Sequence, residues 1–151
     1  MKRTVISGKL LIVPAVMALC GVLASATSSA ADPADRRCSN RTLVGDYGFA
    51  IEGEILGAGL HIRGLALQHY DGRGNITQVD HIVTEGAPPA ENWAPGSGTY
   101  FVNPDCTGVA VINTASNPFP LHLHFIVVKQ GREILQVVDA NAVSAVGRKV
   151  D

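Results

Sequence analysis

The chain has 151 residues, of which 46% are hydrophobic and 17% are charged. A chain of this length fits one domain, and its apolar content excludes an intrinsically disordered protein. Its 16 glycines and 8 prolines exclude a helical bundle, and its formal net charge of −1 excludes the broad basic surface of a nucleic-acid-binding protein.

Residues 1–31 have the three parts of a secretory signal peptide. Three basic residues precede an apolar run over residues 10–23, and small residues follow at 28–31. This order predicts export and cleavage, so that the mature protein is secreted or periplasmic. Because the segment holds three of the 12 basic residues and none of the 13 acidic ones, the mature chain carries a formal charge of −4. We therefore expect neither nucleic acid nor an anionic membrane surface as a partner.

Two alternatives for this segment fit less well. An uncleaved membrane anchor needs about 20 apolar residues, whereas the run over 10–23 has 14. A lipid-modified Cys20 would need a small residue before it, and the sequence has Leu19 there. We expect no membrane insertion after the signal is cleaved.

Two cysteines remain in the mature chain, Cys38 and Cys106, and in an exported protein such a pair is expected to form a disulfide. The bridge would close a loop of 67 residues, which stabilises by about 4 kcal/mol in the chain-entropy model. Two free thiols are the alternative. A metal site on this pair is not expected, because neither cysteine has a second ligand at a familiar short spacing.

A polar N-terminal lead-in over residues 32–41 is followed by a β domain over 42–151. Apolar and polar residues alternate along its segments, and turn sequences rich in Gly, Pro, Asn and Asp separate them. The longest break is the Pro/Gly-rich loop predicted over 86–98. The predicted strands cover residues 42–55, 60–70, 76–85, 99–103, 109–114, 119–129, 133–139 and 143–150.

Eight strands joined mostly by short turns predict an all-β fold, an antiparallel eight-stranded up-and-down barrel with one disulfide. Closing the sheet removes its exposed edges, and an eight-stranded barrel is wide enough to be filled by side chains or to hold one small ligand. An open two-sheet sandwich is the competing architecture. A membrane barrel is disfavoured, because residues such as Glu52, Arg63 and His124 would interrupt its lipid-facing band.

The segments Gly45–Phe49, Tyr70–Asn75, Gly98–Gly108 and Gly131–Ile134 resemble a largely uncharacterised family of small exported bacterial proteins. In that family a Gly-x-Tyr-Gly-Phe strand leads to a DGxGN hairpin and then a TYxVNPDCTG hairpin. The resemblance covers nearly the whole mature chain. More remotely, the chain resembles allene oxide cyclase-like and lipocalin-like barrels of the calycin type. That likeness implies a barrel with a cavity, and it carries over no catalytic residue.

A ligand site is expected inside the barrel. The strand alternation turns several aromatic side chains inward, the long loop can cover one end, and an inward histidine could bond a ligand. The sequence leaves the facing of His81 open, and it favours an outward or satisfied position for Gln68 and Gln136. The predicted ligand-binding residues are Tyr47, Phe49, Tyr100 and Phe125 as lining, Trp93 near the mouth, and His81.

His122 and His124 stand two apart on one predicted strand, so both imidazoles share a face. With a third ligand from His61, His69 or His81 they could bind zinc or copper. The residues between and after them form an apolar face that should point to the core. We therefore expect surface histidines, no metal and no cofactor.

These features predict an exported β-barrel that binds a small apolar molecule. An alternative is a barrel isomerase or cyclase that acts on an apolar substrate by positioning, which requires no nucleophile motif. A second alternative is a cell-envelope structural or interaction protein with a packed interior. No motif identifies catalytic residues. A cavity would favour the first two functions, and a titratable group pointing into it would favour the enzyme.

Overall fold

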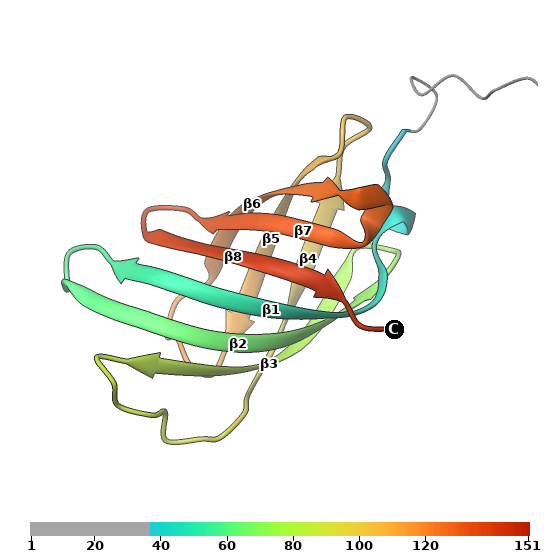
Figure 1. Ribbon diagram of the computed structural model, residues 1–151. Helices are drawn as coiled ribbons and strands as arrows, with labels where there is room; N and C mark the ends of the chain where they lie inside the picture. The colour runs from blue at the N-terminus through green and yellow to red at the C-terminus, as the bar shows by residue number, and fades with distance from the viewer. Residues whose placement is uncertain (1–36) are drawn as a thin grey trace, which may run out of the picture. The chain divides into compact units, whose positions relative to one another are not determined.

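The computed structural model describes residues 37–151 (Figure 1). The predicted signal peptide, which includes Cys20, and residues 32–36 of the lead-in lie outside the described residues. No helix within the described part has the length and apolar character needed to cross a membrane.

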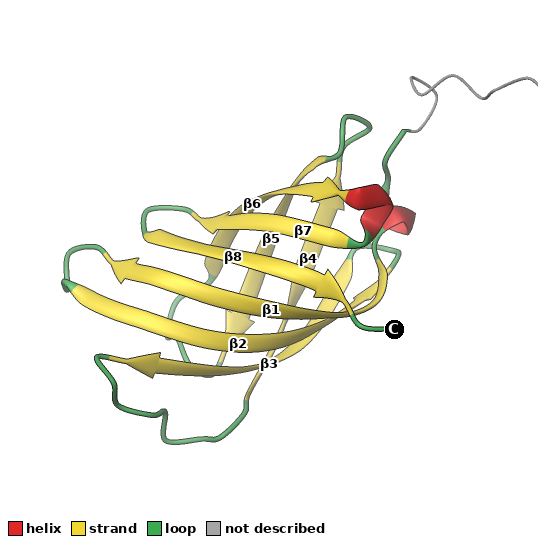
Figure 2. Cartoon of the chain, viewed as in Figure 1, coloured by secondary structure: helices red, strands yellow, loops and turns green. Residues whose placement is uncertain are grey.

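Eight antiparallel strands form a closed barrel in the order in which they occur along the chain, which confirms the predicted fold (Figure 2). Two three-residue 3-10 helices, η2 (Asn40–Thr42) and η3 (Lys129–Gly131), lie at one end. The strands are β1 (Val44–Ile55), β2 (Leu60–Asp71), β3 (Asn75–Thr84), β4 (Ala94–Val102), β5 (Thr107–Thr114), β6 (Leu121–Val128), β7 (Glu133–Val138) and β8 (Ala142–Lys149).

The barrel closes through the pairing of β1 with β8, in which Phe49 stands opposite Gly147. Side chains alternate between the interior and the outer face along each strand, as the pleat requires. On β6, for example, Leu123 and Phe125 are buried, whereas His122 and His124 are exposed. The prediction that these histidines lie on the surface is confirmed.

The predicted loop over 86–98 is too long, because β4 begins at Ala94 and not at Thr99. The reason lies in two glycines that we assigned to the loop. A Cβ atom on Gly98 would lie 2.0 Å from the backbone oxygen of Val111, and one on Gly96 would lie 2.8 Å from that of Asn113. These glycines let β4 pair closely with β5, so they belong to a strand.

The turn between β2 and β3 is organised by Asp71. Its Oδ1 accepts hydrogen bonds from the backbone N–H groups of Arg73, Gly74 and Asn75, at 2.7, 3.0 and 2.9 Å. The side chain and backbone of Asn75, together with the N–H of Arg73, lower the pKa of the Asp71 carboxyl to about 2. Gly72 takes a φ of 74°, as expected for a tight glycine turn.

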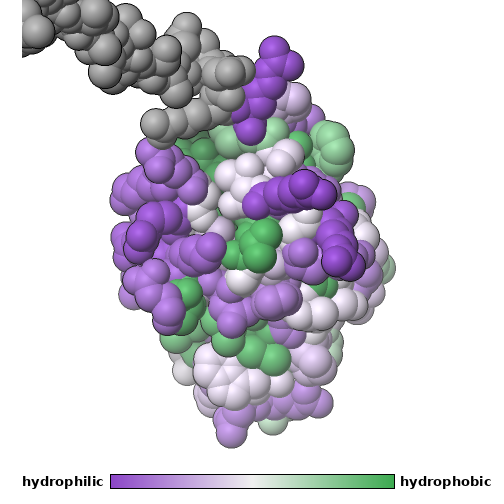
Figure 3. Space-filling model, turned by 90° about the vertical axis from the view of Figure 1, so that its right-hand side faces the viewer, coloured by the Kyte–Doolittle hydropathy of each residue, from purple (hydrophilic) through white to green (hydrophobic). Residues whose placement is uncertain are grey.

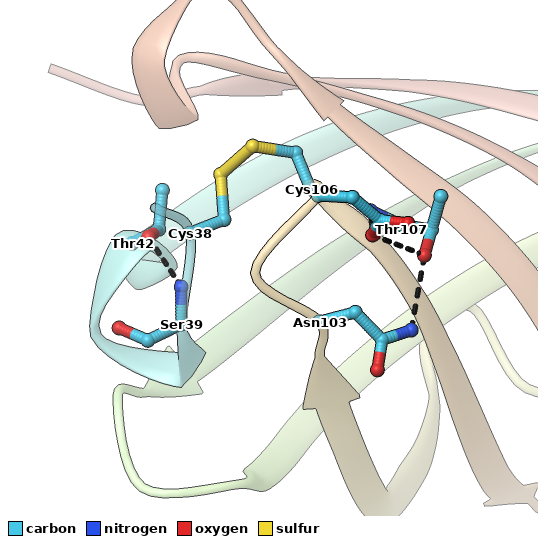
Figure 4. Close-up of a disulfide and its surroundings, with 7 residues drawn as sticks. Cys38, Ser39, Thr42, Asn103, Cys106 and Thr107 are labelled. Carbon is cyan, nitrogen blue, oxygen red and sulfur yellow. Dashed lines mark hydrogen bonds between the residues drawn. A yellow bond between two sulfur atoms is a disulfide. The ribbon is translucent and has the colours of Figure 1, made fainter. Parts of the chain in front are cut away.

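A disulfide joins Cys38 to Cys106, with 5.0 Å between the two Cα atoms, which confirms the predicted pair (Figure 4). It links the segment before β1 to the hairpin between β4 and β5. Asn103 and Thr107 bond to each other beside it, and the N–H of Cys38 donates to the carbonyl of Pro104 at 3.1 Å. The N-terminal segment is thereby fastened across one end of the barrel.

We call this the closed end, because residues 37–43 and the turns 72–74, 103–106 and 129–132 gather there. Inside it, the rings of Tyr47, Tyr70 and Tyr100 pack edge to face, with centroids 5.3 and 5.0 Å apart. The Tyr47 hydroxyl donates to the carbonyl of Gly131, and the Tyr100 hydroxyl lies 3.0 Å from the carbonyl of Leu43. These contacts fill this half of the barrel with aromatic rings.

The outer surface near this end is mixed in character. Figure 3 faces the side that carries η2, η3 and the C-terminus, and there small hydrophobic areas alternate with hydrophilic residues. The strands themselves place many apolar side chains outward, among them Leu65, Phe101 and Val137, which are 57%, 55% and 50% exposed.

Candidate functional site

A cavity of about 570 Å³ occupies the opposite half of the barrel. We call this half the open end, because it is bounded by the loops 85–93 and 115–120 and by the turns 56–59 and 139–141. Residues 87–91 of the first loop and 115–117 of the second border the cavity. The loop that we predicted as a cover therefore does lie at the mouth.

The cavity wall is mainly apolar. Side chains from most strands contribute to it, among them Ile51, Ile62, Ile112, Leu121, Leu123 and Val143. Small residues stand where the closed half has aromatic rings, with Ala66, Ala94 and Ala145 all lining the cavity and all buried. The space exists because these inward positions carry a methyl group and not a ring.

A chain of polar side chains crosses this apolar interior. The Tyr70 hydroxyl donates to Gln68 Oε1 at 2.7 Å, and Gln68 Nε2 donates to Gln78 Oε1 at 2.9 Å. Gln78 Nε2 then donates to Asp80 Oδ2 at 2.9 Å, and the hydroxyl of Thr114 donates to the same oxygen. Three strands, β2, β3 and β5, contribute to this chain, and its hydrogen bonds run toward Asp80.

The sequence reasoning missed this polar chain. Gln68 and Gln136, for which the sequence favoured an outward or satisfied position, are inward, with 2% and 8% exposure. The signal was present in the alternation, since Gln68 shares a face with Tyr70 and Ala66, and Gln78 shares one with Ile76. The alternation of the strand therefore turns a glutamine into the barrel interior even though its polar side chain disfavours burial.

Asp80 lies at the end of the chain and lines the cavity. Its side chain is 3% exposed, and its Oδ1 atom has no hydrogen-bond partner among residues 37–151. A buried polar atom without a partner is rare and marks a position where a further group can be bound.

The expected lining of the cavity needs correction. Tyr47, Phe49, Tyr100 and Phe125 are buried inside the barrel, as the alternation predicts, but none of them borders the cavity. They fill the closed half, where the rings of Phe49 and Phe125 lie over Gly147 and Gly108. Alternation along a strand fixes which face turns inward and leaves the depth of a side chain in the barrel undetermined.

Trp93 and His81 lie on the outer face. Trp93 is 52% exposed, and together with Leu65 and Leu67 it lines a shallow outer groove and not the cavity. Its ring lies 5.9 Å from that of His81, whose Nδ1 is 2.6 Å from the carbonyl oxygen of Asn92. The facing that we left open for His81 is therefore outward, and this pair fastens the end of the loop to the barrel wall.

Three of the four remaining histidines form pairs with carboxylates on the surface. His61 bonds Glu85, His69 bonds Asp46 and His124 bonds Asp139, with Nδ1–oxygen distances of 3.0, 2.7 and 2.8 Å. The bonds from His61 lower the pKa of Glu85. Across residues 37–151, no group of three or more His, Cys, Asp or Glu side chains is arranged to hold a metal ion.

The chain matches no family model, and it matches no curated protein. The geometry of the cavity therefore carries the functional argument.

Proposed function

We propose that this protein is an exported β-barrel that binds one small, largely apolar molecule in the open half of its barrel. The observation that carries this proposal is the cavity of about 570 Å³ with its mainly apolar wall. Ligand pockets typically enclose about 300–1,000 Å³ and combine an apolar lining with a few polar groups that fix orientation. The cavity has both properties.

The barrel interior has one filled half and one hollow half, and this difference favours ligand binding over a purely structural role. A protein that used the barrel only as a rigid body would gain stability by filling its interior, because packed interiors leave few voids. Here one half is filled with aromatic rings, whereas alanines line the other half. The loops 85–93 and 115–120 border that second half, which gives a ligand a route of entry.

Export is supported by two features of different kinds. The N-terminal sequence has the order of a secretory signal, and the Cys38–Cys106 disulfide is typical of oxidising compartments. A protein that acts outside the cytoplasm fits a role in carrying or capturing an apolar molecule that diffuses poorly in water.

The test is a matched pair of phenylalanine substitutions on neighbouring residues of β8. Ala145 lines the cavity, whereas Val146 points outward and is 37% exposed. We expect apolar compounds to raise the melting temperature of the wild type and of V146F by mass action, and to leave A145F unchanged. Equal responses of A145F and V146F, or none from any apolar compound, would contradict binding inside the barrel.

A second candidate function is isomerisation or cyclisation of an apolar substrate held in the same cavity. The observation that favours it is the carboxylate of Asp80, because a buried acid beside a bound substrate can take or give a proton. Chromatography of the bound compound after incubation separates the two functions, since a binding protein returns it unchanged and an isomerase returns a product of equal mass.

A further inference from the structure

The polar chain of the cavity ends at the carboxylate of Asp80, one oxygen of which has no hydrogen-bond partner among the described residues. Among the described residues, Asp80 is the only acidic or basic side chain that is buried. Oδ2 accepts hydrogen bonds from Gln78 and Thr114, and Oδ1 accepts none. A carboxylate oxygen is an acceptor, so the group that would complete this site is a hydrogen-bond donor.

No group of the polar chain donates a hydrogen bond to Oδ1. The amide of Gln78 already donates to Oδ2, and the hydroxyls of Tyr70 and Thr114 are directed at Gln68 Oε1 and Asp80 Oδ2. Each of these hydrogen bonds goes to an acceptor other than Oδ1, and Asp80, the residue that carries this acceptor, lines a space large enough for a ligand.

The charge of the cavity restricts the ligand further. Glu91, in the loop 85–93, is the other charged residue that borders it, and no Lys, Arg or His of residues 37–151 lines it. Two carboxylates and no cation repel an anionic end group. A protonated donor gains most here, because hydrogen bonds between ionised partners are roughly twice as strong as neutral ones.

On the basis of the proposed function, we infer that the ligand is amphipathic, with an apolar body in the cavity and one terminal hydrogen-bond donor that bonds Asp80 Oδ1. A protonated amine is preferred to a hydroxyl as this donor. The two carboxylates that line the cavity disfavour a ligand with an anionic carboxylate end group. The inference gives the cavity an orientation, with the polar end of the ligand at Asp80 and its apolar body against the alanine and isoleucine wall.

The experiment uses four probes that share a decyl body and differ in the end group: decylamine, decanol, decyl methyl ether and decanoate. Titration calorimetry on the disulfide-bonded protein measures their dissociation constants at neutral pH. We expect decylamine to bind about tenfold or more tightly than the ether, which offers no donor. Decanol should lie between them, and decanoate should bind most weakly.

Asp80→Asn removes the charge and keeps the shape of the side chain, and Asp46→Asn is the matched control on the outer face. We expect Asp80→Asn to bind decylamine and the ether alike, and Asp46→Asn to keep the wild-type order. If the melting curve shows that Asp80→Asn does not fold, the order of the four dissociation constants on the wild type still tests the inference.

The outcomes separate the two proposals. Equal binding of amine and ether by the wild type, or tightest binding of decanoate, would overturn the inference while leaving apolar binding in place. Binding of none of the four probes would overturn both. An amine preference that survives in Asp80→Asn would place the end group elsewhere and would also overturn the inference.

Discussion

Single glycines decide how the closed half of the barrel is filled. Gly147 stands opposite Phe49 and Gly108 stands opposite Phe125 in the strand register. A Cβ atom at either glycine would lie 2.3 Å from the facing ring. The aromatic side chain thus occupies the room that a side chain on the partner strand would need, and the two residues act as one packing unit.

We predict that Gly147→Ala destabilises the protein by about 1–3 kcal/mol, because the enclosed Phe49 ring must shift to admit the methyl group. Gly48→Ala on β1 is the control, since the nearest atom to its added Cβ would be 3.9 Å away. Urea unfolding midpoints measure both. Equal losses would show that the Phe49 ring can move freely.

Truncating a ring of the closed half should cost more than changing an outward neighbour. We predict losses of about 3–5 kcal/mol for Phe49→Ala and Phe125→Ala, because both side chains are buried. His122→Ala, on the exposed face of β6, should cost less than about 1 kcal/mol. Chemical denaturation of the three variants tests this order, and a His122 variant as unstable as the other two would contradict the facing of β6.

The lowered pKa of Asp71 predicts that the unfolding free energy of the protein falls at acid pH. Its hydrogen bonds in the turn lower its pKa to about 2, whereas an unfolded aspartate titrates near about 3.9. A depressed pKa gives a contribution that is present above about pH 4 and is lost as the pH falls toward about 2. Asp71→Asn should therefore show a shallower fall of unfolding free energy across this window than the wild type. An unchanged slope would contradict the assignment.

At the scale of elements, most of the fold could be predicted because strand alternation and turn residues are local signals. The turns around Asp71 and Asp105 were expected from their Gly, Asn and Asp content, and the structure has them. The start of β4 was not predicted, because Gly96 and Gly98 look like loop residues when the neighbouring strand is unknown. Their need for close approach to β5 is a tertiary property.

The cavity itself could be predicted only in part. A barrel of eight strands implies an interior, and the long loop indicated which end would open. The sequence could not give the level at which each inward residue stands, which depends on strand stagger around the barrel. For this reason the aromatic residues were assigned to the cavity, while Asp80 and the alanines that form it were not.

The disulfide joins two elements that are distant in sequence, the segment before β1 and the β4–β5 hairpin. We predict that replacing Cys38 and Cys106 by alanine together lowers the unfolding free energy by about 4 kcal/mol, since the bridge closes a long loop in the unfolded chain. Intact mass before and after reduction establishes the bond in the wild type, and denaturant titration gives the loss. A double variant within about 1 kcal/mol of wild type would contradict this estimate of loop closure.

At the scale of the whole molecule, closure depends on one pairing between strands distant in sequence. Seven of the eight strand pairings join neighbours along the chain, and the eighth joins β1 to β8. We predict that deleting residues 142–151 leaves β1 and β7 with free edges and gives self-associated protein. Size-exclusion chromatography measures this, with deletion of residues 150–151 as the control. A monomeric, folded protein without β8 would contradict the role of this pairing.

The pairing of β1 with β8 also determines when the cavity can first bind a ligand. A newly made chain emerges N-terminus first, and its hairpins can form one after another. The cavity wall, however, takes Ile51 from β1 and both Val143 and Ala145 from β8. The pocket is therefore completed by the last strand to appear. Binding must therefore follow the synthesis of β8, because before that the cavity lacks the part of its wall that β8 supplies.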